Sequence, residues 1–128
     1  MAALLVRFAH EAGPEIMKTY CFALDLHDEP GVIEEYKRYH AKDHIWPEVL
    51  KHIRGDGIVS EEIYLAGNRL FMILKTTDEF SLEAKMKADR ESPEMRKWEE
   101  LMWKYQKPLP HARPGEKWMR MEKIFEVK

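Results

Sequence analysis

One stretch of the sequence places three side chains that can move protons or bind metals at regular intervals. Tyr36, His40 and His44 follow one another at four-residue spacing, which stacks side chains on one face of a helix. A histidine has an ordinary pKa of ~6.5, so it can both take and give a proton near neutral pH. The stretch therefore allows acid–base chemistry, with the tyrosine available to hydrogen-bond a substrate.

Two other interpretations of these residues stay open. The first is an ordinary, partly buried helix face on which the histidines have no chemical role. The second is a metal site, because two histidines four residues apart on a helix can supply two ligands. No glutamate follows His40 directly, however, and the sequence indicates no third ligand. The spacing by itself does not choose among the three.

The composition narrows the classes of function. A chain of 128 residues fits one domain with one hydrophobic core. Its formal net charge of -2 argues against binding to nucleic acid, which requires a marked basic excess. The single cysteine, Cys21, excludes an intramolecular disulfide and a cysteine-rich zinc site. We expect an ordinary globular domain whose partners are neither nucleic acids nor membranes.

Motifs for cofactor chemistry are absent from the sequence. It has no glycine-rich phosphate loop, no Gly-x-Ser-x-Gly elbow and no Cys-x-x-Cys pair. The first apolar run, residues 2–6, is far too short to span a bilayer and lacks the basic start of a signal peptide. We therefore expect no cofactor, no metal and a cytoplasmic location.

The elements expected around the Tyr36–His44 stretch alternate between strands and helices. β-Branched and aromatic runs predict strands, helical spacing of apolar residues predicts helices, and Ser92-Pro93 predicts a helix start. In chain order we expect a strand at 19–26, helices at 32–43 and 47–54, strands at 58–65 and 69–76 joined by a loop at 66–68, a helix capped by Asp78 and ending near 90, a helix starting at 92–93, and a last strand at 117–127.

This order predicts an α+β fold of the ferredoxin-like βαββαβ type, with an antiparallel sheet and its helices on one face. The other face of the sheet would be open, and two copies packed sheet to sheet would cover it. We therefore expect a homodimer. Met17 immediately precedes a strand-like run, so residues 1–16 are interpreted as an N-terminal extension and 17–128 as a single domain.

Strings spread over every expected element resemble one known family. They are EYKRYH at 35–40, IWPEV at 45–49, EIYLAGNRLFMIL at 62–74, WEELMWKYQKPLP at 98–110 and GEKW at 115–118. Because of these strings, the chain resembles the L-rhamnose mutarotase family, including its L-fucose mutarotase-like members, over roughly residues 20–125. The resemblance implies a dimeric α/β barrel that interconverts the α and β anomers of a 6-deoxy-hexose, L-rhamnose or L-fucose, without a cofactor. The protein would be a carbohydrate isomerase whose substrate is a monosaccharide.

The resemblance also implies roles for particular residues. The family's catalytic histidine lies one helical turn after a substrate-binding tyrosine, and these positions correspond to His40 and Tyr36. Trp98 occupies a family sugar-contact position, and Glu61 stands where the family has a second sugar-contacting tyrosine. His44 belongs to four residues inserted before the Ile-Trp-Pro motif and is a further candidate for binding the substrate. The strings at 67–72 and 101–110 look closer to members assigned to L-fucose.

Two alternatives to a mutarotase remain at this point. Dimeric ferredoxin-like barrels also include small monooxygenases, and Trp98, Trp103 and His40 would suit such a pocket. A non-catalytic dimer that binds a small ligand in the same cavity is the other. Haem binding would favour the first, and sugar binding without faster anomer exchange would favour the second.

Overall fold

The computed structural model of the chain describes residues 16–55 and 57–128. The elements follow the order predicted from the sequence, and the α+β, ferredoxin-like fold class is confirmed. In chain order they are β1 (Lys18–Leu26), α2 (Pro30–Tyr39), α3 (Pro47–Arg54), β2 (Ile58–Ala66), β3 (Arg69–Thr76), α4 (Leu82–Glu91), α5 (Pro93–Trp103), β4 (Gln106–Lys107) and β5 (Met119–Arg120). The expected extension at 1–16 lies, apart from Ile16, outside the described residues.

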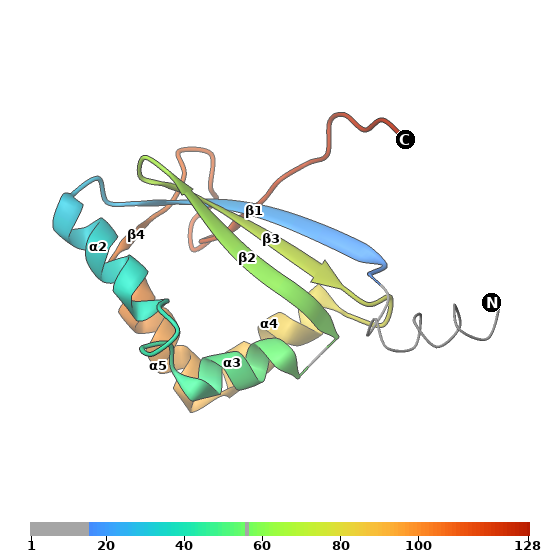
Figure 1. The fold of residues 1–128 in the computed structure, drawn as a ribbon, viewed down its shortest axis with the longest axis horizontal. Helices are drawn as coiled ribbons and strands as arrows, with labels where there is room; N and C mark the ends of the chain where they lie inside the picture. The colour runs from blue at the N-terminus through green and yellow to red at the C-terminus, as the bar shows by residue number, and fades with distance from the viewer. Residues whose placement is uncertain (1–15, 56) are drawn as a thin grey trace, which may run out of the picture.

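The strands form one antiparallel sheet in the order β2-β3-β1-β4, and β5 also pairs with β1. The helices lie on one side of this sheet, with α2 and α5 near the end where β4 pairs (Figure 1). Residues directly opposite each other in an antiparallel pair point to the same face. Leu24 pairs with Leu70 and Tyr20 pairs with Leu74. Because Leu70 and Leu74 lie in the core, all four side chains point to the helix-facing side of the sheet.

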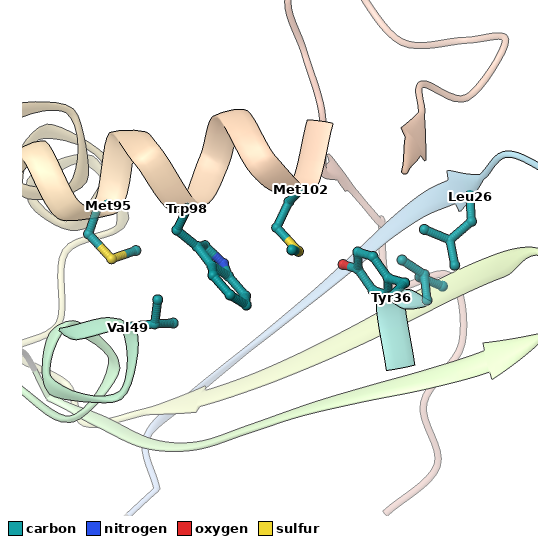
Figure 2. Packing of buried hydrophobic residues seen from close by; sticks show 7 residues of the cluster. Leu26, Tyr36, Val49, Met95, Trp98 and Met102 are labelled. Carbon is teal, nitrogen blue, oxygen red and sulfur yellow. The ribbon is translucent and has the colours of Figure 1, made fainter. Parts of the chain in front are cut away.

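The core fills the space between the helices and that face of the sheet. Met95, Trp98 and Met102 of α5 point towards the strands, and Tyr36 enters the same layer from α2 (Figure 2). The i, i+3, i+7 spacing of the three α5 residues turns one side of the helix to the core. A helix start capped by Ser92 is confirmed, since its Oγ accepts a hydrogen bond from the Met95 N–H at 3.2 Å.

The predicted helix at 32–43 is wrong at both ends. It begins at Pro30, because proline has no N–H and fits the first helical turn. It ends at Tyr39, with His40 as the C-cap and the His40 N–H bonded to the Lys37 carbonyl at 3.1 Å. His44 consequently lies in the following turn rather than on a face shared with Tyr36 and His40.

Three further boundaries differ from the sequence-based expectation. The cap of α4 is Ser81, whose Oγ accepts from the Ala84 N–H at 3.2 Å, and not Asp78. The predicted strand at 117–127 is reduced to β5, because only Met119 and Arg120 pair with β1. The short strand β4 was not predicted, since two residues carry no periodic pattern.

Candidate active site

The last turn of α2 and its C-cap carry the two side chains that the sequence singles out for chemistry. Tyr36 is buried with 4% of its surface exposed, and His40 is half-buried at the helix C-cap. Their ring centroids are 4.5 Å apart, as expected for residues one helical turn apart. The structure therefore brings Tyr36 and His40 together.

Both side chains line a cavity of about 190 Å³ between α2 and the strands. Pockets for drug-sized ligands measure about 300–1,000 Å³, so this cavity suits something smaller, such as a single sugar ring. Its other walls are formed by residues of α2 and by mostly apolar residues of β1, β2 and β3: Lys37, Leu26, Ile63, Tyr64, Leu65 and Leu70.

A main-chain hydrogen bond orients the His40 imidazole. Its Nδ1 lies 2.8 Å from the Tyr36 carbonyl oxygen, which can only accept. In the neutral ring Nδ1 therefore carries the proton, and Nε2 keeps the lone pair. Burial lowers the pKa of His40 below 6.5, although the bond to the Tyr36 carbonyl opposes this effect. At neutral pH the imidazole is thus uncharged and able to act as a base.

The Tyr36 hydroxyl is held in its protonated form. Burial is the main reason that its pKa is raised to about 12; the Glu99 and Glu61 carboxylates raise it further, and a hydrogen bond from Gln106 opposes them. The Gln106 Nε2 donates this bond to the phenol oxygen at 3.2 Å. Tyr36 is therefore suited to hydrogen-bonding a substrate rather than to removing a proton from it.

Glu61 faces the helices from the middle of β2. It pairs with Leu74 of β3, whose side chain is in the core, so the carboxylate points to the same side. Burial raises the pKa of Glu61, and the Asp89 and Glu99 carboxylates add to this effect while Lys85 opposes it. Glu61 is not among the residues that line the cavity, but its charge affects the pKa of Tyr36.

Trp98 packs beneath the site as part of the core. Only 5% of its surface is exposed, and its ring centroid lies 5.2 Å from that of Trp46 and 5.4 Å from that of His40. It does not line the cavity. His44 is exposed in the turn after α2 and is not part of the cavity wall either. The roles in sugar binding expected for both residues stay predictions.

Sequence reasoning missed some residues of the site. Lys37 contributes to the cavity wall, and Gln106 contacts the Tyr36 hydroxyl from a different element. The spacing of Lys37, three residues before His40, could have indicated its position. No local pattern marks Gln106, because its contact with Tyr36 joins residues 70 positions apart.

The metal interpretation of His40 and His44 required both residues on adjacent turns of one helix, and α2 ends before either. Within residues 16–55 and 57–128, no group of three or more His, Cys, Asp or Glu side chains is arranged to hold a metal ion. No helix in the same ranges is long and apolar enough to cross a membrane.

Comparison with known proteins identifies the family. The family model described as L-rhamnose mutarotase matches residues 19–127. The chain belongs to the L-rhamnose mutarotase family. Over 111 residues it is 39% identical to an L-fucose mutarotase of Xanthomonas campestris pv. campestris, a match that covers 87% of this chain and 89% of the relative. It is 33% identical over 117 residues to an L-rhamnose mutarotase of Burkholderia cenocepacia, covering 87% of this chain and 99% of that one.

A solved structure shows the same fold. The crystal structure of an L-rhamnose mutarotase from Formosa agariphila superposes with a TM-score of 0.61 at 19% sequence identity, covering 88% of this chain and all of that one. The family and the reaction class predicted from the sequence, a mutarotase among the carbohydrate isomerases, are confirmed. The monooxygenase and non-catalytic alternatives are not favoured.

Proposed function

We propose that this protein interconverts the α and β anomers of a 6-deoxy-hexose, with L-fucose as the favoured substrate and L-rhamnose as the alternative. The observation that carries the proposal is a neutral imidazole beside a phenol at a cavity of monosaccharide size. The preference for L-fucose rests on the higher identity to the relative named L-fucose mutarotase, 39% against 33% for the named L-rhamnose mutarotase.

The reaction requires one proton to move between two oxygens on the same carbon. The Nε2 of His40 takes the proton of the C1 hydroxyl and gives it to the ring oxygen as the bond between C1 and that oxygen breaks. The open-chain aldehyde rotates about the C1–C2 bond. The former ring oxygen then attacks the other face of the aldehyde and loses its proton to His40, which returns it to the C1 oxygen. No atom is gained or lost, so we propose that the reaction needs no cofactor.

The other predicted site residues receive supporting roles. Tyr36 hydrogen-bonds the sugar and orients it above the imidazole. Trp98 supports the His40 ring and contributes an apolar surface for the sugar's C–H groups. Glu61 accepts a hydrogen bond from a sugar hydroxyl, and His44 binds the sugar at the open side of the site. Each of these roles is a proposal that substitution can test.

We also propose that the protein acts as a homodimer in the cytoplasm. The pairing register places Cys21, Phe71, Ile73 and Tyr64 on the face of the sheet that the helices leave open. The apolar side chains that follow β5 are largely exposed; Ile124, for example, is 88% exposed. An apolar face of this kind favours sheet-to-sheet packing of a second copy. The cytoplasm is where an enzyme of monosaccharide metabolism is expected to act.

Saturation-transfer proton NMR on the anomeric signals of L-fucose and L-rhamnose tests the proposed activity. The native protein should accelerate anomer exchange of at least one sugar, and His40→Ala should lower the rate by about 10²–10⁴-fold. Acceleration with neither sugar would refute the proposed function.

His44→Ala is the matched control, because it removes the other nearby histidine from an exposed turn. Removing a residue that only binds the sugar should raise KM and leave kcat unchanged. If His44→Ala abolishes exchange while His40→Ala does not, the catalytic role belongs to His44.

A further inference from the structure

Gln106 reaches the candidate site from the far end of the chain. It lies in β4, directly opposite Leu26 of β1, so both side chains point to the helix-facing side of the sheet. Only 4% of Gln106 is exposed. The pairing of β4 with β1 therefore places the uncharged Gln106 amide in the core beneath α2.

Only the Nε2 group of this amide has a hydrogen-bond partner among the described residues. Its Nε2 donates to the Tyr36 phenol oxygen at 3.2 Å, whereas its Oε1 is buried and has no hydrogen-bond partner among the described residues. A buried acceptor without a partner destabilises the folded state. Packing therefore does not explain an amide at this position, because an apolar side chain of similar shape would fill the space without that cost.

The hydrogen bond determines what the phenol can do. A phenol oxygen has one proton to donate and lone pairs to accept with. With the Gln106 N–H on a lone pair, the phenol proton is free to point elsewhere. Among the side-chain hydrogen bonds of residues 16–55 and 57–128, the Tyr36 hydroxyl takes part in one, as the acceptor from Gln106.

We propose that Gln106 is a positioning residue that fixes the direction of the Tyr36 hydroxyl, so that its proton is presented to an oxygen of the bound sugar. The proposal rests on the proposed function, because it assigns Gln106 to the orientation of the substrate by Tyr36. Gln106 itself does not line the cavity and acts through the phenol.

Two variants and a control separate this role from a structural one. Gln106→Met keeps the shape of the side chain and removes the donor. Gln106→Glu keeps the shape and supplies a carboxylate that draws the phenol proton to itself. Lys107→Met changes the exposed neighbour on the same short strand and should leave anomer exchange unchanged.

We expect kcat/KM for anomer exchange to fall about 3- to 10-fold in Gln106→Met, the effect of one lost hydrogen bond, and further in Gln106→Glu. In a Tyr36→Phe background the same substitutions should change kcat/KM less than about 2-fold, because the group through which Gln106 acts is already gone. Equal losses in the two backgrounds would overturn the proposal, as would unchanged exchange in both Gln106 variants. If Gln106→Met does not fold, Gln106→Glu carries the comparison.

A second readout needs no activity. In protein labelled at tyrosine Cζ with carbon-13, the Tyr36 signal is identified by its loss in Tyr36→Phe. Gln106→Met should shift this signal in the sugar-free protein and Lys107→Met should not; an unmoved signal would overturn the proposed contact. This measurement stands even if the native protein accelerates neither sugar, which would refute the proposed function and not the positioning of Tyr36.

Discussion

The imidazole of His40 and the indole of Trp98 meet edge to face, with ring centroids 5.4 Å apart and ring planes inclined at 67°. The Tyr36 ring lies against the same imidazole at 4.5 Å. Two aromatic side chains thus shield part of the His40 ring from water, and desolvation by burial is the main cause of its lowered pKa. Three of the predicted site residues are therefore coupled: the aromatic pair sets the charge of the base.

The first prediction concerns the acid limb of the pH–rate profile. The reaction needs the neutral imidazole, and a lowered pKa keeps His40 neutral at pH values at which an exposed histidine is already protonated. We expect kcat/KM to persist at pH 6.5 and to fall only in more acidic solution. Trp98→Leu admits water and should move the acid limb towards ~6.5. Anomer exchange measured by NMR between pH 4.5 and 8 checks this, and an acid limb above 6.5 in the native protein would contradict it.

The second prediction concerns Tyr36→Phe. The substitution keeps the buried ring and removes the hydroxyl, so we expect kcat/KM for anomer exchange to fall about tenfold. The Gln106 amide would lose its partner, and the free energy of unfolding should fall by about 1–2 kcal/mol. Urea unfolding and NMR exchange measure the two effects. Tyr20→Phe is the control, because Tyr20 packs on Phe22 and Phe80 away from the cavity. Equal losses of activity in both variants would rule out a specific role for the Tyr36 hydroxyl.

The third prediction concerns Glu61→Gln. Because the pKa of Glu61 is raised in the folded state, the folded protein binds the proton more tightly than the unfolded chain does. The ionised carboxylate therefore lowers the free energy of unfolding. This loss develops as the pH rises from the pKa of Glu61 in the unfolded chain to its higher pKa in the folded protein. At pH 7 Glu61→Gln should therefore be more stable than the native protein and should melt at a higher Tm, and this gain should disappear in acid.

Glu100→Gln is the control for that substitution. Glu100 is exposed on α5 and belongs neither to the cavity wall nor to the open face of the sheet. Its replacement should leave Tm nearly unchanged between pH 5 and 7. If Glu61 also binds the sugar, Glu61→Gln should raise KM while it raises Tm. If Glu61→Gln is less stable than the native protein at pH 7, interactions with neighbouring groups outweigh the cost of burying the ionised carboxylate.

The fourth prediction concerns the open face of the sheet. If two copies pack through this face, a charge in its centre will separate them, because a buried unpaired carboxylate is costly. Light scattering after gel filtration should give a dimer for the native protein and a monomer for Ile73→Glu. Lys97→Glu, on an exposed position of α5, should remain dimeric. A monomeric native protein would refute the proposed assembly.

Features that depend on neighbouring residues could be predicted from the sequence. Ser92 and Pro93 encode the start of α5, because a cap and a proline act within one helical turn. The apolar run at Arg69–Thr76 encodes a central strand, and the four-residue spacing of Tyr36 and His40 brings their rings together on one turn. The family strings are also local, so they indicated the reaction class.

Features that depend on distant partners could not be predicted in this way, because they arise only in the folded chain. β5 ends after Arg120 because pairing with β1 ends there, and Gln106 lies beneath Tyr36 because β4 pairs with the end of β1. The inward direction of Glu61 follows from its register with β3, and the burial of Trp98 follows from how α5 packs on the sheet. Such contacts join residues far apart in the chain, and their geometry is set by the packing of the whole core rather than by any local pattern.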